Sequence, residues 1–490
     1  MTESRSTYDL AVIGGGSGGI GAALAAARGG LSVVLVEQDA MLGGTSTAAG
    51  VSCWEPGVGG TGIPFDIYKR LKTIPDAVGI YSFNRHFGWQ DGWYWSHALD
   101  KVNFPGGETV IDPARRYADT LHRHVPSGEI LNEAFQREFW HGVIFEPQAF
   151  SDVAVQMLRE TGNCEVCTST RLVDVSIKGG QIASAVLADG SEIAADFWVD
   201  ATGDGFLCTA CGCEILSGKD PKSLFDEPGA PEQGHERGVN GVTLIFRATL
   251  CPEPGVASLP ADIPAECWWT NAFPPVKCDH FPNGDLMINM LPTMSGDEYL
   301  GMTAGNAYAE CVRRVHAQWH FLQTHFPEFR NYRLQSMSPA LGVRESRRVV
   351  CDTMLTEHDI RVGLSDQVHA DIIAIADHPC DRHGPGNGGC KELSQPYGIP
   401  YRCLLPKGVD NLLVASRCAG FSSITASSCR LSRTMMQLGQ AAGTATVLAG
   451  KMQTALRDVP TVNLRAALRD QHVQLDWPPL ENIMEYLHDE

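Results

Sequence analysis

The feature that most restricts the fold of this chain is a cluster of glycines between two short apolar stretches near the N-terminus. Residues 8–13 predict a buried strand, and residues 14–19 follow it with the pattern G-x-G-x-x-G. The alanine-rich residues 20–28 predict a helix, and residues 31–36 predict a second buried strand that ends at Glu37. A strand, a glycine turn, a helix and a strand that ends in an acid predict a Rossmann-like α/β domain that binds a dinucleotide.

Each part of this motif has a physical reason. Gly14 permits a tight turn, Gly16 lets the backbone approach a pyrophosphate, and Gly19 lets the helix pack closely on the strand. The helix N-terminus offers free N–H groups and the positive end of its dipole to phosphates. Glu37 can accept hydrogen bonds from a ribose diol, and it disfavours a 2′-phosphate. The dinucleotide contacts expected from this segment are Gly14, Gly16, Ser17, Gly18, Gly19, Glu37 and Gln38.

Two later segments indicate which dinucleotide is bound. Gly43-Gly44-Thr45, shortly after the acid, resembles FAD enzymes more than NAD dehydrogenases, although taken alone it also fits a surface turn. Residues 171–194 are typical of a β-meander with glycine turns. A strand then leads into Ala201-Thr202-Gly203-Asp204, which resembles the second FAD signature of the glutathione-reductase-like flavoproteins. The strands expected here are 171–177, 181–187, 191–194 and 196–199.

A third block lies near the C-terminus. Residues 409–417 predict a turn and a strand, and residues 431–448 predict a helix with small residues at 439–443. Flavoproteins of this superfamily end their FAD domain in this way, with the helix dipole directed at the flavin. Ordinary small-residue packing would also explain the helix alone. The resemblance adds Gly43, Gly44, Thr45, Ala201, Thr202, Gly203, Asp204 and Arg417 to the expected cofactor contacts.

Residues 341–348, 399–407 and 410–443 resemble the FAD-dependent oxidoreductase family, a relative of the fumarate reductase and succinate dehydrogenase flavoproteins. The resemblance implies FAD, and it implies a substrate domain inserted between pieces of the FAD domain. No His-Ser pair follows the Gly-Gly, so we expect the FAD to be non-covalent. The expected FAD domain comprises residues 1–75, 140–215 and 335–450. The expected substrate or cap domain comprises residues 76–139 and 216–334, and residues 451–490 are expected to pack on the FAD domain as a C-terminal tail.

Two stretches of the expected cap domain are rich in aromatic residues. Residues 81–104 contain Trp89, Trp93 and Trp95, and residues 251–292 contain adjacent tryptophans at 268 and 269. These stretches fit either a substrate pocket or the core of a domain interface. Fold and cofactor therefore follow from the resemblance more firmly than the substrate does.

Several motifs are missing from the sequence. It contains no second strand–G-x-G-x-x-G–helix unit for NADPH and no closely spaced cysteine pair after the Gly-Gly, which argues against a pyridine-nucleotide disulfide reductase. The spacing of Cys208, Cys211 and Cys213, and of Cys164 and Cys167, fits thiolate ligands. However, the first three lie where a packed helix is expected, so we expect buried structural thiols and no metal.

Catalysis by a flavin requires a polar group close to the reacting carbon and a base for the substrate proton. Asp381-Arg382-His383 resembles an Asp-x-His element of the family, which makes His383 the expected acid–base residue; the alternative is a histidine on an exposed loop. Arg344 and Arg347 are expected to anchor an anionic substrate or the cofactor phosphates, or else to form a structural ion pair with Glu345.

Charge narrows the range of partners. Lys and Arg number 38 against 57 Asp and Glu, a net charge of −19, which disfavours nucleic acid and a basic membrane-binding patch. The first residues are polar with no apolar signal segment, so we expect a cytoplasmic protein whose 16 cysteines are reduced. A small-molecule substrate is expected, and the sequence leaves open whether the chain forms a homo-oligomer.

The sequence thus predicts an FAD-dependent oxidoreductase that transfers hydride between a small organic substrate and flavin N5. The alternatives are a flavin-dependent monooxygenase, or a non-catalytic binding protein with the flavin fold, like the GDP-dissociation-inhibitor relatives.

Overall fold

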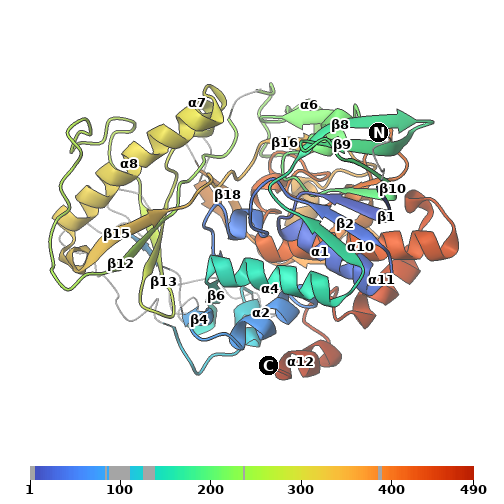
Figure 1. Ribbon diagram of the computed structural model, residues 1–490, viewed down its shortest axis with the longest axis horizontal. Coiled ribbons are helices and arrows are strands. Elements are labelled where there is room, and N and C mark those ends of the chain that lie inside the picture. The colour runs from blue at the N-terminus through green and yellow to red at the C-terminus, as the bar shows by residue number, and fades with distance from the viewer. Residues whose placement is uncertain (1–5, 83–84, 88–110, 125–137, 236–237, 384–388) are drawn as a thin grey trace.

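The computed structural model describes residues 6–82, 85–87, 111–124, 138–235, 238–383 and 389–490. It has two lobes (Figure 1). The larger lobe, at the right, is built on a central sheet that is mostly parallel. The smaller lobe, at the left, is an antiparallel sheet with a long helix on its outer side. We call the smaller lobe the cap lobe.

The central sheet has the strand order β7–β2–β1–β10–β9–β8, and β21 also pairs with β10. Its parallel strands are β1 (Ser6–Ile13), β2 (Val33–Val36), β7 (Cys164–Cys167), β10 (Glu192–Asp200) and β21 (Leu412–Val414). In register, Ile13 lies opposite both Val36 and Asp200, and Asp200 lies opposite Val414. The carboxyl ends of these strands therefore meet at one edge, where ligands bind in open α/β sheets.

Strand β10 has both antiparallel and parallel neighbours. Its first residues pair antiparallel with β9 (Gln181–Leu187), which pairs with β8 (Leu172–Lys178), and its last residues pair parallel with β21. The expected meander is therefore present. The sequence prediction of separate strands at 191–194 and 196–199 is wrong: they form one strand, because Ala195 continues the ladder with β1 opposite Tyr8.

Helices α1 (Ser17–Arg28) and α10 (Ser432–Met452) pack on each other through glycines. A Cβ at Gly439 would overlap the carbonyl oxygen of Gly18, and a Cβ at Gly18 would overlap that of Ala415. The small residues seen in the sequence therefore allow a backbone-to-backbone approach beneath the glycine turn. Helix α4 (Pro147–Glu160) packs beside α1, and α2 (Ile63–Lys72) packs beside α4 and α10.

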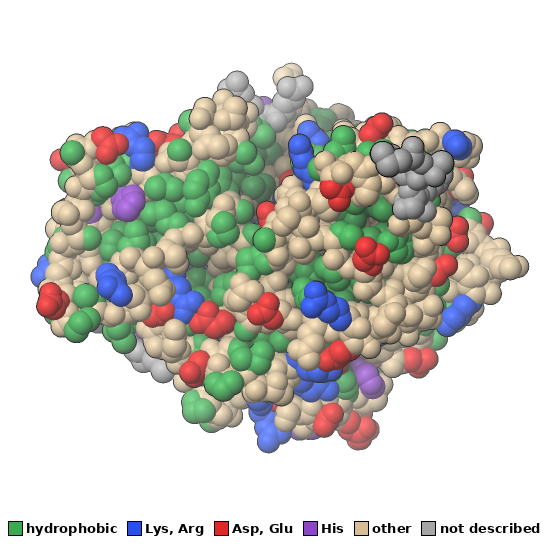
Figure 2. Space-filling view, in the orientation of Figure 1, with side chains coloured by type: hydrophobic (Ala, Val, Ile, Leu, Met, Phe, Trp, Pro, Cys, Tyr) green, Lys and Arg blue, Asp and Glu red, His purple; other side chains and the backbone are tan. Residues whose placement is uncertain are grey.

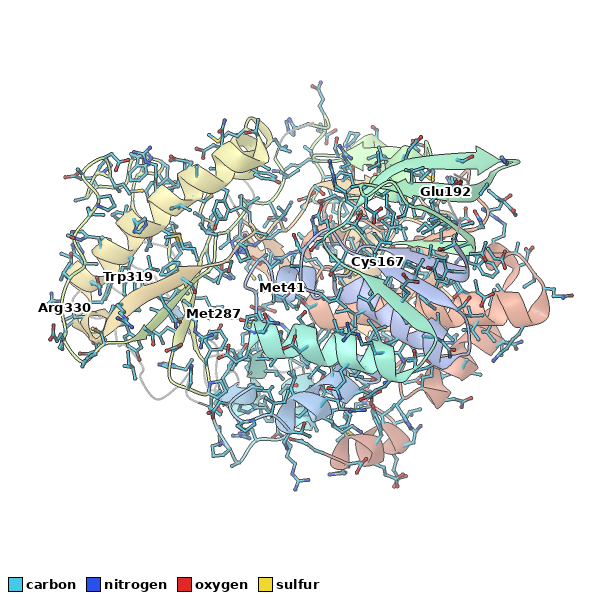
Figure 3. The ribbon with its side chains drawn as sticks, in the orientation of Figure 1. Met41, Cys167, Glu192, Met287, Trp319 and Arg330 are labelled. Atoms are coloured by element: carbon cyan, nitrogen blue, oxygen red, sulfur yellow. The ribbon has the colours of Figure 1, made fainter. Side chains whose placement is uncertain are left out.

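The sheet of the cap lobe has the order β15–β12–β14–β13–β5. Helix α8 (Ala304–His325) covers one face of it, and Trp319 of α8 packs with Phe246 and Ile288. Met287, the neighbour of Ile288, points the other way and packs with Cys53 and Tyr81 of the larger lobe. In Figure 3, Met287 accordingly lies nearer the larger lobe than Trp319 does. The strands are β5 (Arg85–Phe87), β12 (Phe246–Leu250), β13 (Val276–His280), β14 (Leu286–Met290) and β15 (Tyr332–Met337).

Smaller sheets accompany the two main ones. They pair β3 with β6 and β6 with β4, β11 with β16, β17 with β20, and β18 with β19. These strands are β3 (Cys53–Trp54), β4 (Val78–Ser82), β6 (His141–Phe145), β11 (Ile215–Ser217), β16 (Arg347–Val349), β17 (Ile372–Ala376), β18 (Cys380–Arg382), β19 (Gly389–Lys391) and β20 (Tyr397–Pro400). The remaining α-helices are α5 (Phe206–Ala210), α6 (Lys222–Phe225), α7 (Gly296–Leu300), α9 (Glu357–Val362), α11 (Thr461–Asp470) and α12 (Glu481–His488). The 3₁₀-helices are η1 (Gly44–Ser46), η2 (Tyr117–Leu121), η3 (Pro327–Asn331), η4 (Tyr401–Leu404), η5 (Thr425–Ser427) and η6 (Leu456–Asp458).

The hydrophobic core of the larger lobe extends beyond the segments expected for the FAD domain. Ile80 and Tyr117 belong to the same core cluster as the central sheet, and so do Leu464 and Leu487 near the C-terminus. The exact division of the chain into domains stays a prediction. Trp89, Trp93 and Trp95 lie outside the described residues.

Charges of both signs are mixed on the face shown in Figure 2, and hydrophobic side chains gather over the cap lobe. Among the described residues, no helix has the length and apolar character needed to cross a membrane.

Candidate active site

A cavity of about 1020 Å³ opens at the carboxyl edge of the parallel strands. It extends from the glycine turn and Glu37 to Arg344 and His383, and on to Lys277 of the cap lobe. The structure thus brings together segments that are far apart in the sequence. The expected cofactor residues that line it are Gly14, Gly16, Ser17, Gly18, Glu37, Gln38, Gly44, Thr45, Ala201, Thr202, Gly203 and Arg417.

The glycine turn has one tightly packed side and one open side. Gly14 has φ +101°, and a Cβ there would lie 2.5 Å from the carbonyl oxygen of Ala201. A Cβ at Gly16, by contrast, would meet no atom within 4 Å, because this residue faces the cavity. The backbone therefore leaves an open cradle at Gly16.

The first turn of α1 is polar and lacks partners. No side chain caps the N-terminus of α1, and the buried hydroxyl of Ser17 has no hydrogen-bond partner among the described residues. Free N–H groups, an unpaired hydroxyl and the positive end of the helix dipole fit a phosphate. The residues present therefore fit the pyrophosphate of a dinucleotide cofactor.

Glu37 is held in position by the backbone. Its carboxylate accepts hydrogen bonds from the N–H of Gly15 (2.6 Å) and of Asp39 (2.9 Å). Burial raises the pKa of Glu37, and these backbone hydrogen bonds oppose that shift. Each carboxylate oxygen has a second lone pair, so the side chain can still accept from a ribose diol.

The second glycine pair closes over the first turn. The N–H of Gly43 donates to the carbonyl oxygen of Gly15 (2.8 Å), and a Cβ at Gly44 would lie 3.1 Å from Cα of Gly16. Gly44 and Thr45 line the cavity, while Gly43 and Gly19 lie behind it and support the turn.

Asp204 also lies behind the cavity lining. Its carboxylate accepts a hydrogen bond from Nη2 of Arg417 (2.6 Å) and another from the hydroxyl of Ser346. Arg417 itself lines the cavity. In this geometry Asp204 holds Arg417 in the cavity wall, and direct contact of Asp204 with the cofactor stays a prediction.

His383 lies in a charged cluster that is only slightly exposed to solvent. Its Nε2 is 2.7 Å from Oδ2 of Asp381, and Nη2 of Arg430 donates to the same oxygen at 2.7 Å. Burial and the nearby Arg344 lower the pKa of His383 despite the attraction of Asp381. Burial alone would raise the pKa of Asp381, but His383 and Arg430 hold it well below its ordinary value. At neutral pH the pair is therefore a neutral imidazole beside a carboxylate.

Arg344 lines the cavity without a carboxylate partner. Its Nη1 donates to the carbonyl oxygen of Gly241 (2.8 Å) and to the hydroxyl of Thr243 (2.7 Å). No carboxylate of the described residues lies within ion-pair distance of it. Burial and the neighbouring Arg430 lower the pKa of Arg344 to about 10. A guanidinium that still carries unmatched charge and faces open space fits an anionic group of a ligand.

Arg347 does not reach this cluster. It is exposed on β16, and its guanidinium carbon lies 5.7 Å from the centre of the Phe206 ring. Side chains alternate along a strand, so Arg348 is the one that points inward, where it pairs with Asp220 at 2.6 Å. The geometry gives no support to a catalytic role for Arg347.

The polar far end of the cavity was not predicted from the sequence. Nζ of Lys277, on β13, lies 3.3 Å from Sγ of Cys53, 3.4 Å from Oε1 of Glu55 and 3.2 Å from Oδ2 of Asp279. Oε2 of Glu55 lies 3.5 Å from Nε2 of His378. The sequence carried no signal for this cluster, because polar and apolar residues alternate in 276–280, a pattern typical of a strand with one solvent-facing side.

The aromatic residues 268 and 269 do not line this cavity. Trp269 packs with Phe273 and Phe321 of the cap lobe, whereas Trp54 and Trp140 line the cavity. Residues 384–388, the glycine-rich segment after His383, lie outside the described residues.

The cysteine cluster has the environment of structural thiols. Cys208 and Cys213 are buried, and Cys164, Cys167 and Cys211 are half-buried. In the part of the chain that the structure describes, no three His, Cys, Asp or Glu residues are grouped to hold a metal ion.

The fold and the cavity fit an α/β protein that binds a dinucleotide at the carboxyl edge of its parallel strands. The sequence profile of the FAD dependent oxidoreductase family matches residues 9–468, and the chain belongs to this family. It is therefore an FAD-dependent enzyme, and the predictions of family, fold class and enzyme are confirmed.

Similarity to individual proteins is more limited. A segment of 50 residues is 52% identical to 4-oxocyclohexanecarboxylate 2-dehydrogenase from Sinomonas cyclohexanicum, which covers 10% of this chain and 9% of that protein. Among solved structures, a geranylgeranyl bacteriochlorophyll reductase-like protein from Thermoplasma acidophilum is 11% identical, with a TM-score of 0.43 over 99% of this chain and 97% of the other. A flavin-dependent brominase is 12% identical, with a TM-score of 0.45 over 95% and 83%.

Proposed function

We propose that this enzyme oxidises or reduces a small anionic organic molecule by hydride transfer at flavin N5, with the FAD held non-covalently. The observation that carries the proposal is that one continuous cavity joins the dinucleotide cradle to Arg344 and His383. FAD, when bound, supplies the acceptor or donor of the hydride. The chain itself binds the substrate, moves its proton and limits its contact with water.

Arg344 is proposed to bind the anionic group of the substrate. Its free N–H groups can form charge-assisted hydrogen bonds, which are strong in a site screened from water. Thr243 and the carbonyl oxygen of Gly241 fix the guanidinium, so little conformational freedom is lost when the substrate binds.

His383 is proposed to take a proton from the substrate during oxidation, or to return it during reduction. Asp381 holds the imidazole in place and stabilises its protonated form, and Arg430 in turn fixes Asp381. A neutral imidazole is the form that can accept a proton at physiological pH.

The test is anaerobic screening of paired compounds, each a carboxylate and its neutral methyl ester, for bleaching of the visible flavin band. The carboxylate member is expected to reduce the flavin, and the ester is expected to react much more slowly. Arg344→Gln should remove this preference, whereas Arg159→Gln, an exposed arginine on α4 away from the cavity, should keep it.

Two results would contradict the proposal. Equal rates with acids and esters would show that the enzyme does not recognise an anionic group of its substrate. Incorporation of labelled oxygen from O₂ into the product would favour the monooxygenase instead.

Acid precipitation of the protein should release all the flavin as FAD, and colour retained in the pellet would show a covalent bond.

A further inference from the structure

Two large apolar side chains that are open to solvent line the cavity beside the segment that leads into β8, where the N–H of Thr170 donates to the carbonyl oxygen of Glu37. Val173 on β8 is 59% exposed and Phe206, the first residue of α5, is 50% exposed, and both line the cavity. Exposed apolar side chains gathered in a concave site are typical of ligand contact, because leaving them in water is unfavourable.

The backbone brings these two side chains to the same place. Helix α5 packs beside β8, so Phe206 and Val173 come from neighbouring elements. Gly205, with φ +66°, turns the chain sharply after the strand end at Asp200 and starts the helix at Phe206. The projection of Phe206 into this arm of the cavity thus follows from the turn.

Arg347 approaches Phe206 from a different element. Strand β16 carries this exposed arginine, and its guanidinium carbon lies 5.7 Å from the ring centre of Phe206, within the range of a cation–π contact. Among the described residues, this is the only side-chain interaction that Arg347 makes. The contact restricts the ring of Phe206 without occupying the cavity.

Glu37 identifies the group that belongs in this arm. An acid at the end of the second strand accepts hydrogen bonds from the adenosine ribose. The base attached to that ribose is a flat aromatic purine, and it must lie beside the acid. A purine can stack on an exposed aromatic ring and pack against an aliphatic side chain.

We infer that Phe206 and Val173 hold the adenine ring of FAD, Phe206 by stacking, and that Arg347 is a positioning residue which orients Phe206. This assignment goes beyond the proposed function, because it concerns retention of the cofactor and not the substrate reaction. It also gives a role to Arg347, which does not reach the catalytic cluster.

The experiment measures how tightly the full-length protein holds FAD and, separately, FMN, which lacks the adenosine half. The holoprotein is diluted and the rise in fluorescence of released flavin is followed; the stripped protein is titrated with each flavin. Phe206→Ala should weaken FAD binding about tenfold or more, the usual effect of losing one base–aromatic stack. It should leave FMN binding unchanged, because FMN has no adenine to lose.

Three further variants separate stacking from a general structural effect. Phe206→Tyr should keep wild-type affinity for FAD, since it keeps the ring. Arg347→Gln should weaken FAD binding about two- to fivefold, the size of an exposed cation–π contact, and should have no effect in the Phe206→Ala background. Leu224→Ala, at a side chain that is 46% exposed on α6, serves as a matched surface control and should change nothing.

The inference is overturned if Phe206→Ala leaves FAD affinity within about twofold of the wild type. It is equally overturned if FAD and FMN binding fall together, because that would show a disturbed fold. None of these readouts requires a substrate, so they stand even if the proposed reaction proves wrong.

Discussion

At the scale of single residues, the cavity places its charged side chains in different electrostatic situations. Asp381 has two partners, His383 and Arg430, whereas Arg344 bonds only to uncharged oxygens. This difference separates groups that hold the site together from groups that are available to a ligand.

Replacement of His383 tests whether the imidazole moves a proton. His383→Asn should keep the fold and bound FAD but slow flavin reduction by substrate roughly 10²–10⁴-fold, the usual contribution of a general acid–base group. The measurement is anaerobic stopped-flow reduction at saturating substrate. Equal rates in the two proteins would remove His383 from the mechanism.

The pH dependence of the same step follows from the lowered pKa of His383. The imidazole must be neutral to accept a proton. Burial and Arg344 lower its pKa below the ordinary value of 6.5, so the imidazole is still neutral at that pH. The groups that face it are Asp381 from β18 and the two arginines, Arg344 and Arg430. The rate of substrate oxidation should therefore stay high at pH 6.5 and fall only in more acidic buffer. A loss of rate that is half complete above pH 6.5 would contradict this assignment.

At the scale of elements, close packing of α1 on α10 holds the glycine turn in shape. Gly439 and Gly443 of α10 contact the backbone of α1 directly, with no room for a Cβ. The first turn of α1 is also the part that fits the pyrophosphate. Packing and cofactor binding are therefore coupled through the same helix.

This coupling can be measured with two glycine-to-alanine variants. Gly439→Ala should lower the thermal midpoint and the FAD content together, because α10 must move away from the carbonyl oxygen of Gly18. Gly305→Ala, near the start of α8 where a Cβ meets nothing within 4 Å, should leave FAD unchanged and stabilise the protein by about 0.4–1 kcal/mol. A Gly439→Ala protein with normal FAD content and midpoint would show that α10 adapts freely.

At the scale of the whole molecule, the two lobes meet through a buried charged contact. Lys277 of the cap lobe is 2% exposed in its side chain, and its ammonium lies between Glu55 of the larger lobe and Asp279 of its own strand. Burial alone would lower the pKa of Lys277, but Asp279, Cys53 and Glu55 raise it well above its ordinary value. The lysine therefore stays charged where the lobes touch.

Lys277→Met should destabilise the protein by about 3–5 kcal/mol, because it leaves the buried carboxylate of Asp279 without its cation and removes one partner of the half-buried Glu55. Arg70→Met is the control: Arg70 pairs with Glu160, both side chains are exposed, and the pair should contribute less than about 1 kcal/mol. Denaturant unfolding of the FAD-loaded proteins compares the two. Equal, small effects would mean that Asp279 and Glu55 take up protons or find other partners at little cost.

The sequence alone determined the parts of this protein whose physics is local. A glycine turn after a buried strand, the acid at the end of the next strand and the small residues of 439–443 specify backbone geometry within a few residues of each other. They predicted the central sheet, the meander and the family. Strand β7 (Cys164–Cys167) was not predicted, and the error at residues 191–199 arose because a ladder partner on β1 kept the chain extended.

The tertiary structure decided which charged side chains share the cavity. Arg344 and Arg347 look alike in the sequence, but strand alternation sends Arg347 to the surface beside Phe206. Lys277 and Glu55 are far apart along the chain and meet only because the cap lobe folds over the larger one. Charge interactions depend on distance in space and on burial, and neither can be read from residue spacing when the partners lie on different elements.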